Sequence, residues 1–313
     1  MCNGTIMDKL ISFAIPLMLS GILQLMFNAV DIIVVGRFSG SQSLAAVGST
    51  TALINVFTNL FIGISLGANV LAARYYALEK SKEMSETVHT AIAFALISGV
   101  GMAVIGLLMA KPALELMGTP DDVIAKSTLY MRIYFCGMPF FMLYNYGAAI
   151  LRAVGDTKRP LIFLLISGVI NAILNLFLVI QFHLDVAGVG IATVISQLIS
   201  CILVLRCLYC SESSYQFRPE KLNIRSSYLR QIFEVGIPAG IQSTVINLSN
   251  AMLQSSVNSF GSISMAGYTA ANNILGFLYA SINSVTQACM SFTSQNYGVR
   301  KFKRMDKVLI DCA

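Results

Sequence analysis

Asp31 is the acidic residue in this sequence whose position most strongly indicates chemistry. Of the fifteen Asp and Glu residues, it alone lies well inside a long apolar segment, since Glu234 stands only at the entrance of another. A carboxylate in hydrocarbon is costly, so it normally faces a cavity or a polar partner. Gln24 and Asn28 precede it at helical spacing, with Ser20 one turn earlier, so the four side chains share one helix face.

Polar residues of three other apolar segments are expected at the same depth as Asp31. A helix rises by about 1.5 Å per residue, and counting from the outer ends of the segments places them in one layer. They are Tyr130, Asn171, Asn175 and Thr193. In a pocket of such groups, a carboxyl group hydrogen-bonded by neutral partners could exchange a proton or help to bind Na⁺. The alternative is that Asp31 extends to the membrane interface and has no such role.

Two further features could serve transport, one as a hinge in a helix and the other as the polar lining of a cleft. Pro16 interrupts the backbone hydrogen bonds of the first apolar segment below Asp31, as a moving hinge or as a static kink. Asn247 and Asn250 form a polar stripe in one late segment, and Asn283 and Gln287 lie one turn apart in the next. These stripes could line a water-filled cleft or form hydrogen bonds between helices.

Nothing in the sequence suggests an enzyme, a cofactor or a metal centre. There is no Ser/His/Asp set, HExxH motif or phosphate-binding loop, and the two histidines, His89 and His183, fall near opposite membrane faces. Cys207 and Cys210 have a redox or zinc spacing but no further Cys pair or nearby His. The only small ligand expected, besides substrates, is a coupling ion, H⁺ or Na⁺.

The composition is that of a membrane protein. Apolar residues make up 56% of the 313 residues and charged residues 12%, about half the charged share of a soluble domain. Eight segments are long enough to cross the hydrocarbon core as helices. They are residues 10–36, 44–73, 88–110, 123–150, 160–182, 187–209, 230–259 and 265–296. The predicted fold is therefore an all-α bundle of about eight transmembrane helices.

Charge predicts the orientation of these segments. If the N-terminus is cytoplasmic, all but four of the 21 basic residues lie on the cytoplasmic side, as the positive-inside rule requires. The four exceptions are Arg37, Lys111, Lys126 and Arg132. We therefore expect a multi-pass protein of the cell membrane, in contact with lipid. Because the basic residues sit in short loops without interleaved aromatic residues, no nucleic-acid partner is expected.

An internal repeat divides the chain. Ala14-Ile-Pro16 matches Gly236-Ile-Pro238 at an offset of 222 residues, and Asn28 matches Asn250 at the same offset. The repeat predicts a six-helix N-terminal lobe (1–209), a cytoplasmic loop (210–229) and an incomplete C-terminal lobe of two helices (230–313). Gly63-x-x-x-Gly67 and Gly236-x-x-x-Gly240 are motifs that allow close approach of helices.

With these residues in view, the chain resembles the multidrug and toxic compound extrusion (MATE) family of cation-coupled efflux transporters. The matching segments include Val30-Asp31-Ile-Ile-Val-Val-Gly36, Leu151-Arg-Ala-Val-Gly-Asp156-Thr-Lys-Arg-Pro160 and Val186-Ala-Gly-Val-Gly-Ile-Ala-Thr193. The resemblance implies two six-helix lobes around a cleft, alternating access, and roles for the residues at Asp31 and Pro16. The chain departs from some members at Asn175, where they carry an acid. It also lacks the last four of the twelve helices that the resemblance implies.

Three hypotheses remain open at this point. The leading one is an H⁺- or Na⁺-coupled multidrug antiporter, or an N-terminal fragment of one, that exports small, amphipathic, cationic compounds as a monomer. The second is a lipid-linked saccharide flippase of the related superfamily, for which the sequence lacks interior basic residues. The third is a fragment that does not transport.

Overall fold

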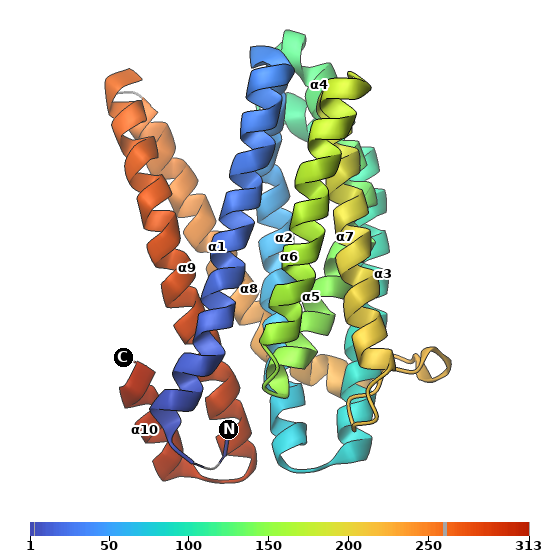
Figure 1. Cartoon of the computed structure of the whole chain (residues 1–313), viewed down its shortest axis with the longest axis vertical. Coiled ribbons are helices and arrows are strands. Elements are labelled where there is room, and N and C mark those ends of the chain that lie inside the picture. The colour runs from blue at the N-terminus through green and yellow to red at the C-terminus, as the bar shows by residue number, and fades with distance from the viewer. Residues whose placement is uncertain (3, 259–261, 313) are drawn as a thin grey trace.

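The computed structural model describes residues 1–2, 4–258 and 262–312, and this part of the chain is helical without strands. The predicted all-α class is therefore confirmed (Figure 1). The helices are α1 (Ile6–Phe38), α2 (Gly40–Ala77), α3 (Ser81–Leu116), α4 (Asp121–Cys136), α5 (Met138–Ala153), α6 (Lys158–Leu176), α7 (Asp185–Tyr209), α8 (Ser226–Asn258), α9 (Ser262–Gly298) and α10 (Phe302–Cys312). A π-turn, Phe177–Gln181, extends α6, and a 3₁₀ turn, Pro219–Lys221, interrupts the loop before α8.

Five helices in the described chain are long and apolar enough to cross a membrane: α1, α2, α3, α7 and α6 with its π-turn. The predicted span 123–150 is divided into two consecutive helices, α4 and α5, which meet at Gly137 and both pack against α3. Pro139 follows immediately, and a proline cannot donate to the preceding turn. The predicted spans 230–259 and 265–296 correspond to α8 and α9, in which the Asn, Gln and Ser residues reduce the hydropathy.

The first seven helices form one bundle, on which α8 and α9 dock as a hairpin. Helix α2 is central, since it packs against α4, α5, α8 and α9, while α6 packs between α1 and α7. The core of this bundle is apolar and includes Phe135, Met138, Met142 and Tyr146, each no more than 1% exposed. The N- and C-termini lie at the same end of the bundle (Figure 1), which we call the terminal end.

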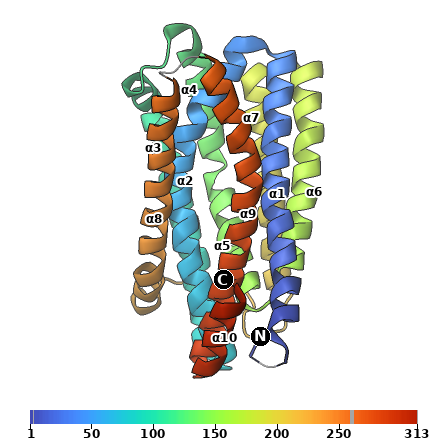
Figure 2. The ribbon, with the colours of Figure 1, turned by 90° about the vertical axis from the view of Figure 1, so that its left-hand side faces the viewer.

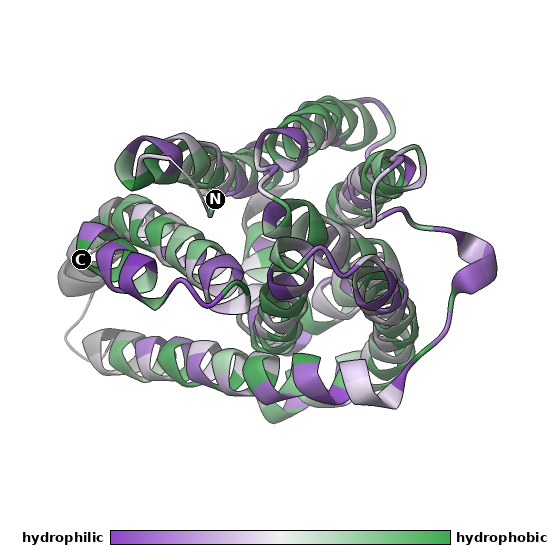
Figure 3. Cartoon of the chain, turned by 90° about the horizontal axis from the view of Figure 1, so that it is seen from below, coloured by the Kyte–Doolittle hydropathy of each residue, from purple (hydrophilic) through white to green (hydrophobic). Residues whose placement is uncertain are grey.

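Hydropathy separates the sides of the bundle from its terminal end. Seen from that end, the helices are mostly apolar, and hydrophilic residues gather on the loops and helix ends (Figure 3). The loop after α7 is held to α3, because the Arg218 backbone N–H donates to His89 Nε2 at 3.1 Å and Phe217 stacks on the same ring. This loop ends earlier than predicted, since α8 begins at Ser226.

The hairpin α8–α9 repeats features of α1–α2. Pro16 lies inside α1 and Pro238 inside α8. The starts of α3 and α10, at Ser81 and Phe302, differ by 221 residues, nearly the offset of the prolines. Helix α10 therefore occupies the position in the second repeat that the start of α3 occupies in the first. The division into two lobes stays a prediction.

Candidate functional site

A chain of hydrogen bonds connects Asp31 on α1 to α6 and α7. Asn175 on α6 donates through Nδ2 to Asp31 Oδ1 and also to Asn171 Oδ1, the latter at 3.2 Å. Asn171 Nδ2 lies 3.5 Å from Thr193 Oγ1 on α7, and that hydroxyl donates to the Val189 carbonyl at 2.9 Å. Four of the residues predicted at one depth are thus connected across three helices.

Helix α6 presents both asparagines to this network because they are one turn apart. Asn171 is 5% exposed and Asn175 is fully buried, while Asp31 is half-buried. The α-helix ends one residue after Asn175, and the π-turn begins at Phe177. Single π-turns are rare and often occur at functional sites. Below the network, Phe27 packs so tightly on Gly168 that a side chain there would clash with its ring, which fixes α1 against α6.

Two tyrosines of α4 complete the surroundings of Asp31. Tyr130 was predicted in this layer and is 7% exposed, and the Tyr134 ring centroid lies 6.3 Å from its own. The Asp31 carboxylate is close enough to interact electrostatically with both phenol groups. The sequence reading missed Tyr134, although its position one turn after Tyr130 was a usable signal.

Asn175 also carries a buried oxygen that lacks a partner among the described atoms. Its Oδ1 is fully buried without a hydrogen bond, and buried polar atoms of this kind usually mark a function or a water site. The amide can present either its N–H₂ or its oxygen to Asp31. A charged carboxylate needs the first arrangement, and a protonated carboxyl group can donate to the second. The pair can therefore accommodate both charge states of Asp31.

The other predicted residues of α1 do not join this network. Gln24 and Asn28 are exposed and make no side-chain hydrogen bond within the described chain. Both lie on the surface of α1 between the side that faces α6, marked by Phe27, and the side where Gly21 approaches Ala280 of α9. Ser20 donates to the carbonyl of Pro16 at 2.8 Å. The structure therefore does not connect Gln24 and Asn28 to the Asp31 network, and their place in the polar pocket stays a prediction.

The polar residues predicted to line a cleft in the second lobe are not gathered together. Asn247 donates to the Ser243 carbonyl of its own helix at 2.8 Å, and Asn250 is exposed. Asn283 is exposed on α9, whereas Gln287, one turn on, accepts a hydrogen bond from Arg152 on α5 at 3.0 Å. A role for these four side chains in a common cleft stays a prediction. Pro16 is buried within α1, and its role as a hinge also stays one.

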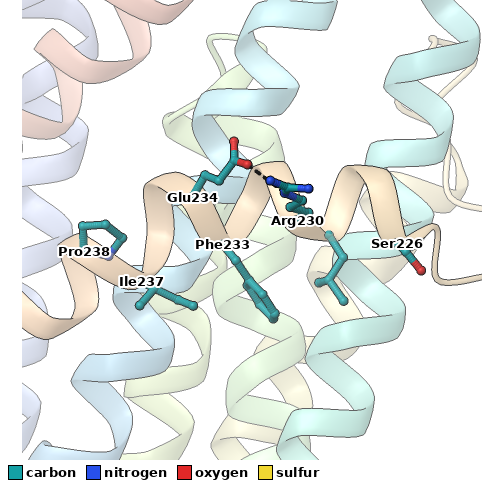
Figure 4. A pocket seen from close by; sticks show the side chains of 7 residues that line it. Ser226, Arg230, Phe233, Glu234, Ile237 and Pro238 are labelled. Atoms are coloured by element: carbon teal, nitrogen blue, oxygen red, sulfur yellow. Dashed lines mark hydrogen bonds and ion pairs between the residues drawn. The ribbon is translucent and has the colours of Figure 1, made fainter.

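An apolar pocket of about 520 Å³ lies elsewhere, along the first turns of α8. Phe233 and Ile237 point to one side of the helix there, and Arg230 and Glu234 to the other (Figure 4). The two charged groups form an exposed ion pair at 3.1 Å, which contributes little to stability. This pocket contains no residue of the Asp31 network.

The fold and this site define the class of the protein, an α-helical multi-pass membrane protein with a half-buried, hydrogen-bonded acid in its bundle. The MatE family model matches residues 16–177 and 238–312. The chain therefore belongs to the MatE family, a family of transporters, and the predicted MATE resemblance is confirmed.

Curated relatives agree with this assignment. The chain is 32% identical over 306 residues to the probable multidrug resistance protein YoeA of Bacillus subtilis, with 95% of this chain and 66% of that protein covered. It is 22% identical over 316 residues to the multidrug export protein MepA of Staphylococcus aureus, with 98% and 68% covered. The chain thus spans about two thirds of the length of these relatives.

Solved structures have the same fold. The chain superposes on an outward-facing multidrug resistance MATE family transporter of the MOP superfamily with a TM-score of 0.92 and 21% identity, covering 99% of this chain and 69% of that one. A MOP superfamily transporter from Pyrococcus furiosus gives a TM-score of 0.90, also at 21% identity and with the same coverage.

Proposed function

We propose that this chain is a multidrug efflux antiporter that works by alternating access and is driven by H⁺ or Na⁺. Its substrates are small, amphipathic, cationic compounds. The names of the curated relatives support the export of drugs. The excess of basic residues at the terminal end supports a cytoplasmic location for that end, in the cell membrane.

The observation that carries the coupling proposal is the bond from Asn175 to Asp31 within a network of three helices. When Asp31 is charged, it accepts this bond and holds α1 to α6. When a proton binds, the carboxyl group no longer attracts the amide N–H₂ as strongly, and it becomes a donor itself. Each change of charge thus alters the contact between α1 and α6, and α1 also carries Pro16.

Sodium is the alternative coupling ion, and the same atoms suit it. Hard cations prefer oxygen ligands, and two oxygen donors lie close together here, the half-buried Asp31 carboxylate and the buried Asn175 Oδ1. An ion bound there would compete with the Asn175 N–H₂ for the carboxylate. The two ions therefore use one site, and only the driving gradient distinguishes them.

The test is dye export from vesicles or cells that contain the chain, under an imposed proton or sodium gradient. Asp31→Asn keeps the size of the side chain and removes its titration, so we expect gradient-driven export to fall at least tenfold. Asp8→Asn is the matched control, since Asp8 is an exposed acid of the same helix. Undiminished export by Asp31→Asn would reject the coupling role. Export that responds to one gradient alone identifies the ion.

A further inference from the structure

A strip of polar residues on α9 joins the hairpin to the first bundle near the terminal end. Gln287, Ser291 and Gln295 are spaced by four residues and so lie on one face of α9. Ser291 Oγ donates to Asn69 Oδ1 on α2 at 3.0 Å, and Gln295 Nε2 donates to the Ala153 carbonyl on α5 at 2.6 Å. Together with the bond from Arg152 to Gln287, these contacts form what we call the α9 clasp.

The contact at Ala153 completes the end of α5. The last carbonyls of a helix have no partner within it, and here a turn satisfies three of them. Ile150, Leu151 and Arg152 accept from the backbone N–H groups of residues 154, 156 and 155, respectively. The fourth carbonyl, that of Ala153, accepts from Gln295. The α9 clasp therefore supplies a donor to the one terminal carbonyl of α5 that the turn leaves without a partner.

Burial along α9 is uneven. Ser291, Gln295 and Asn296 are no more than 3% exposed, whereas Leu278, Tyr279 and Ile282 are at least 56% exposed. The part of α9 nearer the terminal end is thus packed against the first bundle, while one face of its preceding turns is exposed. The ribbons agree, since α9 lies against α1 near the terminal end and diverges from it further on (Figures 1 and 2).

The clasp consists of contacts that water can replace. Arg152 makes its side-chain bonds to Gln287 and to the Ala148 carbonyl, with no carboxylate partner in the described chain. A polar cavity of about 600 Å³ reaches Gln295 from the terminal end and is also lined by Lys9, Tyr76 and Ser213. The net contribution of such hydrogen bonds to stability is small, because water offers equivalent partners.

We propose that the α9 clasp is the gate that closes the terminal end of the transport pathway. Opening it separates α9 from α5 and α2, lets water reach Arg152 and Asn69, and exposes the interior to the side that carries the termini. This proposal rests on the proposed alternating access, but it assigns the closing contacts to particular residues. Gln295 is the main positioning residue, because among the described side chains it is the one that donates to the last carbonyl of α5.

The test measures access to the closed face directly and needs no substrate. Ala149, which is 1% exposed beside the clasp, is changed to cysteine in a chain whose seven native cysteines are replaced. A membrane-impermeant maleimide is added to inside-out or right-side-out vesicles. Combining Ser291→Ala with Gln295→Leu should raise the labelling rate about tenfold from the terminal side and leave the other side unchanged.

Matched variants separate a gate from general loosening. Ser281→Ala removes a hydroxyl that bonds only to its own helix, at the Phe277 carbonyl, and Gln242→Leu alters an exposed amide of α8. Neither should change labelling. Gln295→Asn keeps the amide but shortens its reach, so its labelling rate should resemble that of Gln295→Leu. Gel filtration of each variant checks that it folds.

Unchanged labelling in folded clasp variants would overturn the gate, whatever the result with Asp31→Asn. Equal increases on both sides would also overturn it, because they would indicate a loosened bundle. Because labelling requires neither dye nor gradient, the gate and the coupling role can fail independently.

Discussion

The hairpin α8–α9 meets the first bundle through two contacts of opposite character. At the α2–α8 crossing, Gly63 and Gly67 face Gly236 and Gly240, and the backbones touch. A Cβ at Gly236 would lie 2.6 Å from the Ile64 Cα, and one at Gly240 would lie 2.6 Å from the Leu60 carbonyl oxygen. At the α9 clasp, long polar side chains span the gap instead.

The difference indicates which contact can open. A glycine crossing holds helices by dispersion over touching backbones, and water has no room to enter it. A polar contact can exchange each of its hydrogen bonds with water at low cost. We therefore infer that the α2–α8 crossing stays closed as a pivot while the α9 clasp breaks and reforms.

The largest expected effect is at the crossing. In Gly67→Val, the new side chain would clash with the Ile232 carbonyl and lie 2.9 Å from the Gly236 nitrogen. Overpacking of this kind costs about 3 kcal/mol, so the free energy of unfolding in mixed detergent micelles should fall by that amount. Gly48→Val, on the same helix with no atom within 4 Å of the added Cβ, should change it little.

The same variants also test the division between pivot and gate. Gly67→Val should not selectively raise labelling at Ala149→Cys from the terminal side. A selective increase as large as that of the clasp variants would contradict the pivot, because the crossing would then control access as well.

A smaller effect is expected at the centre of the clasp. Asn69 is 6% exposed, donates to the Ala149 carbonyl at 2.9 Å and accepts from Ser291. Asn69→Leu removes both bonds and deprives the buried Ser291 hydroxyl of its acceptor, so unfolding should become easier by roughly 2 kcal/mol, and labelling should rise from the terminal side only. Asn59→Leu is the control, since Asn59 bonds only within α2, to the Asn55 carbonyl. Equal loss of stability in both variants would contradict the assigned role of Asn69.

The sequence predicted how deep each polar residue lies in the membrane better than it predicted which neighbouring helix the side chain faces. Because the rise of a helix is fixed, counting residues was enough to place Asp31, Asn175 and Thr193 in one layer. The angle around each helix axis depends on how the helices pack, so helical spacing alone did not show that Gln24 and Asn28 lie outside the hydrogen-bond network of Asp31. Gln295 was overlooked for a related reason, since a polar residue near the end of a span looks like an interface residue until its partner on another helix is known.

The close-approach motifs show the same limit. Their spacing predicted tight packing at Gly63, Gly67, Gly236 and Gly240, but it could not pair one motif with the other. The break between α4 and α5 had a local signal, Gly137 two residues before Pro139. That signal was outweighed by the continuous apolar run around it.

The smallest expected effect sharpens the comparison most. Gln231 on α8 accepts a hydrogen bond from the Tyr75 hydroxyl on α2 at 3.2 Å, a polar bond beside the glycine crossing. If touching backbones hold that crossing, Gln231→Leu should lower the free energy of unfolding by only roughly 0.5 kcal/mol and leave labelling at Ala149→Cys unchanged. Tyr75→Phe, which removes the same bond from the other side, should give the same result. If either variant allows the maleimide to react from the terminal side, the crossing depends on its side chains as the α9 clasp does. That result would contradict the assignment of the crossing as a pivot held by backbone contact.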